Sequence, residues 1–357
     1  MNSELPHKMT VLGVMSGTSL DGLDLALCSF EKTGESYSFK IESATTIAYS
    51  GSWKETLANA QDLNAEKYFR LHHNYGSFIA SEINKFIKHV AKPFAVASHG
   101  HTVFHQPHLG FTTQIGCGAT IAAHTGLVTV SDFRSLDVAK GGQGAPLVPI
   151  GDKLLFPEYG ACLNIGGIAN VSFNANHYQK AYDICFANMA LNYLSEKLGK
   201  PYDENGELAC SGKCNEQLLE EINRAKSPVG KVSLSREQFE KTIIPLLNYS
   251  RIPVEDKLAT MCAYSGNEIA STLSENNLES VLVTGGGAYN KCLVDSIQNG
   301  FKGRLIIPAD EIVQFKEALI FAFLGYLRLH GTINTLSSVT GATSDSVSGA
   351  VYFNQPV

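Results

Sequence analysis

Val11-Leu-Gly-Val-Met-Ser-Gly-Thr-Ser-Leu-Asp-Gly-Leu-Asp-Leu-Ala-Leu27 is the stretch that decides the fold. An apolar run gives way to a polar, glycine-rich turn with Thr18, Ser19 and Asp21, and apolar alternation resumes at Leu23. The pattern predicts a strand, a turn and a second strand. Two interpretations of the turn stay open. It is either a polar hairpin tip or a phosphate-binding turn, in which glycine lets backbone N–H groups approach an anion and a carboxylate holds magnesium.

The same pattern returns in the second half of the chain, at residues 161–173. An apolar strand is again followed by a glycine turn, Gly166-Gly167, and by a second apolar strand. A helix is predicted over 188–198. We therefore expect a two-domain α/β protein built from two related halves with a cleft between them.

A third apolar segment ends in Gly285, Gly286 and Gly287 and leads into a predicted helix over 291–298. Backbone N–H groups at a helix N-terminus favour anions. Any one glycine turn is weak evidence, but the three together favour a nucleotide site. The chain has neither a P-loop sequence nor Gly-x-Gly-x-x-Gly, so neither a P-loop nor a Rossmann nucleotide site is indicated.

Length and composition set the broad class. A chain of 357 residues with 44% hydrophobic residues is long enough for two domains. A net charge of −6 without a basic block argues against nucleic acid as a partner. The eight cysteines are scattered, which predicts free buried thiols. No signal-peptide core precedes residue 10, and the longest apolar run, 318–324, is too short for a bilayer, so we expect a soluble cytoplasmic protein without membrane partners.

Several elements follow from periodicity. Residues 10–50 alternate like a strand meander, and residues 54–90 have helical spacing. A short buried strand is predicted at 94–97. Further helices are expected from Asp256, as a cap, through about 273, and over about 311–330.

Four histidines follow the predicted strand at 94–97: His99, His101, His105 and His108. Imidazole is a good zinc ligand, but no cysteine or carboxylate stands nearby at matching spacing. Contact with a substrate and a purely structural loop are the alternatives. A resident metal site is not predicted.

Asp183 ends an apolar segment just before the predicted helix at 188–198. A carboxylate that is partly desolvated there becomes a stronger base. The alternative is a helix cap. Asp132 and Arg134 are either a ligand-binding pair or an interdomain ion pair. For Glu317, at the start of the C-terminal helix, the alternative to a ligand contact is that it only complements the helix dipole.

Eight motifs together closely resemble the 1,6-anhydro-N-acetylmuramic acid kinase family. They run in order from about residue 10 to 352 and cover essentially the whole chain. They are Met15-Ser-Gly-Thr-Ser-Leu-Asp-Gly-Leu-Asp24, Ser98-His-Gly-His-Thr-Val-Phe-His105, Gln114-Ile-Gly116, Asp132-Phe-Arg134, Gly141-Gly-Gln-Gly-Ala-Pro-Leu-Val-Pro149, Leu163-Asn-Ile-Gly-Gly-Ile-Ala-Asn170, Gly285-Gly-Gly-Ala-x-Asn290 and Val339-Thr-Gly-Ala342.

The resemblance implies membership of the acetate and sugar kinase/Hsp70/actin superfamily. Its fold is α/β, with two RNase H-like domains around a central cleft, for which we expect residues 1–133 with about 335–357, and residues 134–334. The implied reaction uses ATP and Mg²⁺. Water opens the 1,6-anhydro bridge of an anhydro-amino-sugar while O6 is phosphorylated, giving N-acetylmuramic acid 6-phosphate in peptidoglycan recycling. A homodimer is compatible with the resemblance.

The resemblance also implies roles for individual residues. Asp183 is the base that activates water. Mg²⁺ arrives with ATP and lies near Asp21, and the predicted nucleotide-binding residues are Gly17, Thr18, Ser19, Leu20, Asp21, Gly22, Leu23, Asp24, Gly166, Gly167, Gly285, Gly286, Gly287 and Asn290. The predicted sugar-binding residues are His99, Thr102, Gln114, Asp132, Arg134 and Glu317. Arg134 is the expected partner of the lactyl carboxylate of the sugar.

The chain departs from the family pattern at three places. The Asp-Thr-Gly-Pro-Gly-Asn motif is Asp183-Ile-Cys-Phe-Ala-Asn188 here, Asn192 stands where Asp is frequent, and His101 replaces a common Gln. We expect a lineage variant that keeps Asp183 as base. The alternatives are a kinase for another anhydro-sugar, a relative without catalytic activity, and an Hsp70- or actin-like nucleotide switch.

Overall fold

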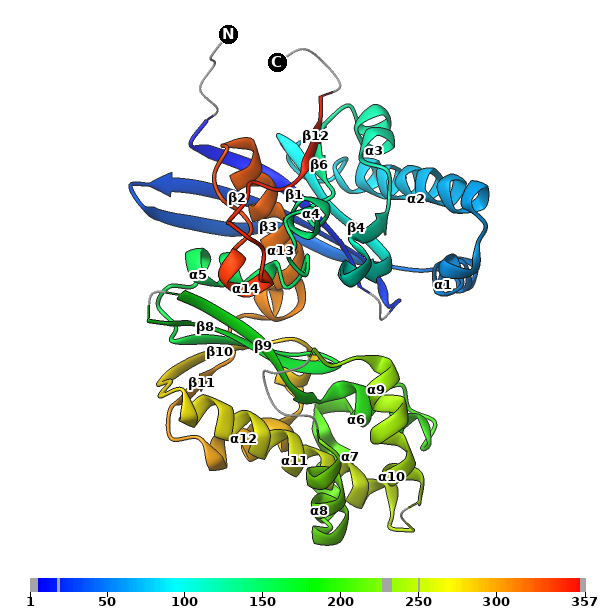
Figure 1. The fold of residues 1–357 in the computed structure, drawn as a ribbon, viewed down its shortest axis with the longest axis vertical. Helices are drawn as coiled ribbons and strands as arrows, with labels where there is room; N and C mark the ends of the chain where they lie inside the picture. The colour runs from blue at the N-terminus through cyan, green and yellow to red at the C-terminus, as the bar shows by residue number, and fades with distance from the viewer. Residues whose placement is uncertain (1–5, 18–19, 177, 227–232, 250, 354–357) are drawn as a thin grey trace. The chain divides into compact units, whose positions relative to one another are not determined.

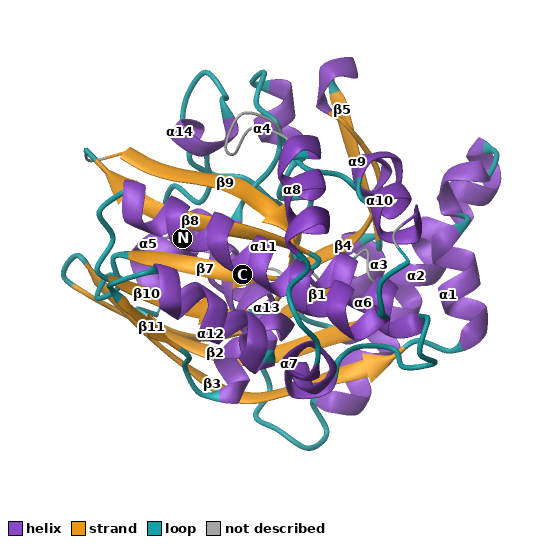
Figure 2. Cartoon of the chain, turned by 90° about the horizontal axis from the view of Figure 1, so that it is seen from below, coloured by secondary structure: helices purple, strands orange, loops and turns teal. Residues whose placement is uncertain are grey.

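The computed structural model describes residues 6–17, 20–176, 178–226, 233–249 and 251–353. The chain forms two compact units, unit 1 (Met1–Leu155 and Phe315–Val357) and unit 2 (Phe156–Gln314). Each unit is built on one β-sheet flanked by helices, which confirms the predicted α/β class (Figures 1 and 2).

Unit 1 contains a seven-stranded sheet whose main path has the order β12-β6-β4-β1-β2-β3, with β5 paired to β4. The first three strands form the predicted antiparallel meander, and β4 and β6 continue it in parallel. The strands are β1 (Lys8–Ser16), β2 (Gly22–Thr33), β3 (Ser36–Ala48), β4 (Ala95–Gln106), β5 (Phe111–Ile115), β6 (Val128–Ser131) and β12 (Ala350–Tyr352).

Helices cover both faces of this sheet. Tyr75 and Ile79 of α2 pack with Leu12 and Val96 on one face, and α13 packs on the other, where a Cβ added to Gly13 would meet the Ala318 carbonyl. The helices of unit 1 are α1 (Gly51–Ala58), α2 (Ala65–Phe86), α3 (Gly118–Thr125), α4 (Ser135–Ala139), α5 (Val148–Leu155), α14 (Ser337–Thr340) and all but the first turn of α13 (Asp310–Leu329).

Unit 2 repeats the topology of unit 1. Its order is β11-β10-β7-β8-β9, again an antiparallel meander followed by two parallel strands. The strands are β7 (Ala161–Ile165), β8 (Ile168–Ala175), β9 (Tyr178–Phe186), β10 (Ser280–Thr284) and β11 (Arg304–Ile306). This repetition confirms the expectation of two related, RNase H-like halves.

The helices of unit 2 bury one apolar cluster with this sheet. They are α6 (Asn188–Glu196), α7 (Glu207–Ser211), α8 (Glu216–Ala225), α9 (Arg236–Thr242), α10 (Ile244–Tyr249), α11 (Val254–Glu275) and α12 (Lys291–Gly300).

The units divide the chain at residues 155 and 315, whereas the sequence suggested 133 and about 335. Packing of α13 explains the difference at the second boundary. The rings of Phe30 in β2 and Phe323 in α13 lie 5.3 Å apart, and a Cβ on Gly325 would come within 2.5 Å of the Ala97 side chain. These contacts join the C-terminal helix to the first sheet well before residue 335.

Three local predictions need correction. The strand predicted at 94–97 continues to Gln106, so the histidines lie within and just after β4 instead of in a loop. Glu317 lies two turns inside α13, because the helix begins at Asp310. Pro253 precedes α11, and Asp256 sits in its first turn, where it accepts a hydrogen bond from the Lys213 backbone.

The eight cysteines are free thiols. Cys210 and Cys214 are exposed and Cys292 is half-buried, so the prediction of buried thiols is wrong at these three positions.

Within the described part of the chain, no helix is both long and apolar enough to cross a membrane.

Candidate functional site

The two glycine turns of unit 2 lie side by side. Gly285, at the end of β10, has φ +82°, and a Cβ there would come within 2.7 Å of the Ile165 carbonyl oxygen at the end of β7. Gly287 also lies against the end of β7, because a Cβ on it would come within 2.2 Å of the Ile165 side chain. Both glycines are therefore needed for the two strand ends to approach each other.

Gly286 is different, because nothing in the fold requires it. A Cβ on Gly286 would meet only Asn188 Nδ2, at 3.6 Å, and one on Gly166 would meet nothing closer than 3.4 Å. Neither glycine has the positive φ that disfavours other residues. A Cβ at Gly166 or Gly286 would therefore make only ordinary van der Waals contacts. The fold does not itself need glycine at these two positions, and the close approach of a phosphate to the backbone would be a reason for it.

Asn188 and Asn290 hold this region together. Asn188 Nδ2 donates to the Ile165 carbonyl over 3.1 Å, and its backbone N–H donates to Gly166. Asn290 is buried and caps α12, since its Oδ1 accepts the Leu293 N–H over 3.0 Å. Asn188 is not among the site residues predicted from the sequence, although it ends the altered motif that begins at Asp183.

In unit 1, the corresponding turn joins β1 to β2. Leu20 has φ +60° and donates its N–H to the Gly17 carbonyl, and the Asp21 side chain is exposed. Leu23 is fully buried in the core, so only its backbone could meet a ligand. Gly22 packs its backbone against β3. The predicted contacts of Thr18 and Ser19 lie outside the described residues.

Asp24 is the third residue of β2 and is half-buried. Its Oδ1 accepts a hydrogen bond from Thr46 Oγ1 over 2.6 Å. Desolvation raises the pKa of Asp24, the Thr46 hydrogen bond lowers it, and the charge of Asp21 raises it further. The two carboxylates therefore repel each other, and a divalent cation between them would relieve that repulsion.

His99 and Arg134 form a directed pair. Arg134 Nε donates to His99 Nε2 over 3.0 Å, and Nη1 donates to the Gly144 carbonyl over 2.6 Å. The His99 proton must therefore sit on Nδ1, 2.9 Å from the Gly100 carbonyl oxygen. Burial, and then the charge of Arg134, hold the pKa of His99 well below its usual range, so the ring is neutral.

Arg134 keeps donors for a ligand. Burial lowers its pKa to about 10, which still leaves a cation at neutral pH. No residue in the described part of the chain accepts a hydrogen bond from Nη2. The Glu317 side chain is exposed to solvent on one side. Desolvation by the surrounding protein nevertheless raises its pKa; the charge of Arg134 lowers this pKa, and the charge of Asp24 raises it. The fold thus brings His99, Arg134, Glu317 and Asp24 into one electrostatic neighbourhood.

His101 belongs to a different network. Its Nδ1 lies 3.1 Å from Ser16 Oγ, which accepts from Tyr49, and the Tyr49 and Tyr75 hydroxyls lie 2.5 Å apart. Burial lowers the pKa of His101 to about 4. The network joins the last residue of β1, just before the Gly17 turn, to the α2 face of the sheet.

The remaining predicted sugar-binding residues have mainly structural hydrogen bonds in the described chain. Thr102 pairs in register with Gln114, whose Nε2 donates to Thr112 Oγ1 over 2.9 Å. Asp132 has φ +57° and accepts the Ser135 N–H. It forms no ion pair with Arg134 among the described residues.

Asp137 is a further residue of this region that the sequence pattern did not predict. It is buried and accepts hydrogen bonds from the Gly144 N–H over 2.8 Å and from Thr340 Oγ1 over 2.7 Å. Gly142 leaves no room for a Cβ beside this carboxylate. Asp137 thereby links the motif at 141–149 to the motif at 339–342. The first of these motifs contains the Gly144 carbonyl that accepts a hydrogen bond from Arg134.

Asp183 lies within β9, three residues before its end. Its Oδ2 accepts from the Leu234 N–H over 2.9 Å and from Ser233 Oγ over 3.1 Å. Oδ1 accepts from none of the described residues. Asp183 does not cap α6, which begins after Ala187 without a side-chain cap.

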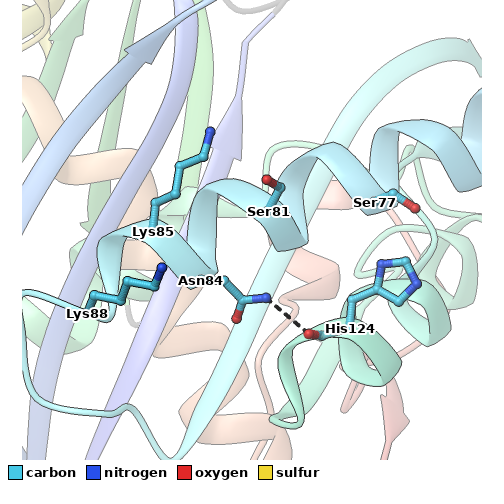
Figure 3. A pocket seen from close by; sticks show the side chains of 6 residues that line it. All are labelled: Ser77, Ser81, Asn84, Lys85, Lys88 and His124. Carbon is cyan, nitrogen blue, oxygen red and sulfur yellow. Dashed lines mark hydrogen bonds between the residues drawn. The ribbon is translucent and has the colours of Figure 1, made fainter.

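Other charged features lie outside the predicted site. A buried ion pair joins Lys316 Nζ to Asp152 Oδ1 at 2.8 Å. A shallow hollow of about 580 Å³ lies between α2 and α3 (Figure 3). None of the predicted site residues lines it, and its lining residues are Ser77, Ser81, Asn84, Lys85, Lys88 and His124. No cluster of three or more potential metal ligands occurs in the part of the chain that the structure describes.

Comparison with known proteins gives a consistent result. The family model of anhydro-N-acetylmuramic acid kinase matches residues 9–354. The curated anhydro-N-acetylmuramic acid kinase of Sulfurimonas denitrificans is 35% identical over 96% of this chain and 98% of its own length. The curated anhydro-N-acetylmuramic acid kinase of Bacillus thuringiensis (strain Al Hakam) is 32% identical over 97% of this chain and 99% of its own length.

Solved structures match at lower similarity. The activator of 2-hydroxyisocaproyl-CoA dehydratase from Clostridium difficile with bound ADPNP has a TM-score of 0.41 at 17% identity, covering 87% of this chain and 92% of its own. A ROK family glucokinase from Streptomyces griseus in complex with glucose and AMPPNP has a TM-score of 0.40 at 11% identity, covering 88% and 97%.

Proposed function

The chain belongs to the anhydro-N-acetylmuramic acid kinase family, and we propose that Asp183 is the base of an ATP-dependent reaction that opens and phosphorylates 1,6-anhydro-N-acetylmuramic acid. The product is N-acetylmuramic acid 6-phosphate, and the reaction serves peptidoglycan recycling. The proposal includes a cytoplasmic location, because ATP is a cytoplasmic metabolite, and it leaves a homodimer as a prediction.

The hydrogen bonding of Asp183 is the observation that carries this proposal. Oδ2 is held by Leu234 and Ser233, which fixes the plane of the carboxylate, and Oδ1 has no described partner. A fixed carboxylate with one open oxygen can take a proton from water as the water attacks the anomeric carbon. The O6 that leaves the anomeric carbon then becomes the nucleophile toward the γ-phosphorus of ATP.

The glycine turns are the proposed phosphate contacts. The open positions at Gly166 and Gly286 support backbone N–H contacts to phosphate oxygens in unit 2. In unit 1, Gly17 and the following residues are assigned the same role. Asn290 is proposed to act by holding the start of α12.

Asp21 and Asp24 are the residues that would hold magnesium. Their mutual repulsion fits a cation, and Asp21 is exposed to receive it. When bound, Mg²⁺ neutralises charge on the phosphate oxygens. Thr46 fixes the orientation of Asp24 for this role.

Arg134 is the proposed partner of the lactyl carboxylate. It keeps an open Nη2, and the neutral His99 ring orients it without neutralising its charge. Glu317 is the proposed acceptor for a sugar hydroxyl or amide N–H beside Arg134. Thr102, Gln114 and Asp132 complete the proposed sugar contacts.

The test is Asp183→Asn. We expect kcat to fall by about 10²- to 10⁴-fold, the usual contribution of a general base, while ATP affinity is unchanged. Ser233→Ala is the matched variant, because it removes one hydrogen bond from Oδ2 and leaves the carboxylate. It should lower kcat only severalfold. An Asp183→Asn enzyme that keeps most of its activity would exclude Asp183 as the base.

A further inference from the structure

We propose that Tyr49 and Tyr75 are positioning residues for nucleotide binding: through the Ser16 side chain they hold the end of β1, and with it the Gly17 turn, in the conformation that binds phosphate. The inference rests on the proposed function, because that function assigns the Gly17 turn to the nucleotide. The hydrogen-bond network that carries it lies entirely within unit 1.

The network is a chain of four side chains. Tyr49 Oη donates to Ser16 Oγ over 2.8 Å, the Tyr49 and Tyr75 hydroxyls lie 2.5 Å apart, and Ser16 Oγ lies 3.1 Å from His101 Nδ1. None of the four residues exposes more than 5% of its surface. They come from β1, the segment after β3, α2 and β4, so the network joins four separate parts of the unit.

The surroundings of this network are apolar. Leu12 and Val14 precede Ser16 on the same face of β1 and belong to the hydrophobic core under α2. Replacing both partners of a buried hydrogen bond by apolar groups of the same shape is often neutral or stabilising. General stability therefore does not explain why Ser16, Tyr49 and Tyr75 are polar, and a role in positioning does.

The hydrogen bonds of the network have one direction. The Tyr49 proton is given to Ser16, so the Tyr75 hydroxyl must donate to Tyr49. The Ser16 proton is then directed to His101 Nδ1, and we expect the neutral ring to carry its own proton on Nε2. Burial lowers the pKa of His101 to about 4, which keeps the ring neutral near pH 7. A chain with one direction fixes the rotamer of Ser16.

The backbone pairing of β1 with β4 is irregular just where Ser16 lies. The parallel register that pairs Val14 with Ser98 is shifted by one residue at the next pair, Ser16 and His101. Gly100 permits the shift with its φ of +76°. An extra residue in one strand disrupts the backbone ladder locally. The hydrogen bond between Ser16 and His101 links the two strands across this irregularity.

Gly17 follows Ser16 directly and begins the proposed phosphate turn. The other end of the turn is held in the same way, since Thr46 Oγ1 of β3 donates to Asp24 Oδ1 over 2.6 Å. Tyr49 lies just after β3. The end of β3 and the residue that follows it therefore supply one side-chain hydrogen bond to each side of the turn.

The test is Tyr49→Phe, which removes only the hydroxyl at the centre of the network. We expect the Kd for AMPPNP with Mg²⁺, measured by calorimetry on the full-length protein, to rise about three- to tenfold, the usual effect of losing one or two hydrogen bonds. The affinity for 1,6-anhydro-N-acetylmuramic acid, measured without nucleotide, should fall no more than in the control.

Tyr326→Phe is the matched control. Tyr326 lies in α13 of the same unit, is also buried, and donates to the His7 carbonyl over 2.8 Å, so the variant loses a hydrogen bond of the same kind. Urea unfolding of both variants measures the stability that each has lost. Only Tyr49→Phe should weaken AMPPNP binding, which separates positioning from a general loss of stability.

Ser16→Ala shows whether Tyr49 acts through Ser16. This variant should itself weaken AMPPNP binding. Adding Tyr49→Phe to it should weaken binding no further, because the two substitutions break the same link.

Three outcomes would overturn the inference: AMPPNP binding that is unchanged in Tyr49→Phe, an equal loss of binding in Tyr326→Phe, and additive losses from Tyr49→Phe and Ser16→Ala. Each of them leaves the proposed function intact. Wild-type protein that binds no AMPPNP would contradict the proposed function, and the inference would fall with it.

Discussion

Arg134 illustrates how one residue acquires its role from its neighbours. The guanidinium is held at two points, by the neutral His99 ring and by the Gly144 carbonyl, and Asp137 fixes the segment that carries this carbonyl. Two points of attachment orient the planar group and leave Nη2 for a ligand. A lysine would supply charge at the same place but not this geometry.

Arg134→Ala tests the assignment of the sugar carboxylate. A charge-assisted hydrogen bond contributes about 1.5–3 kcal/mol, so KM for the anhydro-muramic sugar should rise by about 10- to 100-fold. For an anhydro-sugar that lacks the lactyl group, KM should change far less. Steady-state kinetics with both sugars give the comparison within one variant. An equal rise for both would assign Arg134 a structural role.

The lowered pKa of His101 predicts how the free energy of unfolding depends on pH. Its pKa is about 4 in the folded protein, below the ordinary value of 6.5. Between these values the unfolded chain binds a proton that the native protein does not, so stability is lost as pH falls from 6.5 toward 4.

Urea unfolding of wild type and His101→Gln at pH 7 and pH 4 measures this term. The wild type should lose about 2–3 kcal/mol more than the variant over this range. All other titrating groups are common to both proteins and cancel in the difference. Equal losses would mean that His101 is not buried as a neutral ring.

At the level of elements, strand–turn–strand patterns were predictable because each glycine turn interrupts a clear apolar run. The contacts of His101 were not predictable from the sequence. In a regular strand His99 and His101 would share a face, but Gly100 has φ +76° and breaks the alternation. His99 therefore contacts Phe321 of α13, while His101 contacts Tyr75 of α2.

The boundary between the two units at residue 315 could not be predicted from the sequence either. Nothing in the composition of residues 315–334 reveals that Gly13 and Gly325 admit α13 against the first sheet. Among the predicted site residues, the structure brings His99, Glu317 and Asp24 into the neighbourhood of Arg134. One of the hydrogen bonds that support it, from Thr340 Oγ1 to Asp137 Oδ1, joins residues that are 203 positions apart in the sequence.

Gly286→Ala tests the phosphate-binding turn as an element. The fold has room for this Cβ, so unfolding free energy should stay within about 0.5 kcal/mol of wild type, whereas a backbone close to phosphate predicts at least about tenfold weaker ATP binding. Gly287→Ala is the contrasting variant, because its Cβ would meet Ile165 and should destabilise the protein. Unchanged ATP affinity in Gly286→Ala would exclude this turn from the site.

At the scale of the whole molecule, the two units share one topology but carry different chemistry. Unit 1 supplies the charged group around Arg134 and the carboxylates Asp21 and Asp24. Unit 2 supplies the open glycines and Asp183. The repeated sheet provides strand ends at which such groups collect, and we propose that they serve a common reaction.

The central claim is that water opens the anhydro bridge in the same reaction that phosphorylates O6. The most direct measurement is the mass of the product formed from ATP, magnesium and 1,6-anhydro-N-acetylmuramic acid in ¹⁸O-water, sampled early and compared with preformed product in the same water as a control for exchange. We predict a ring-opened sugar phosphate with one ¹⁸O, formed only with the sugar present. ATP turnover that is indifferent to the sugar, or a phosphorylated product without ¹⁸O, would contradict the account.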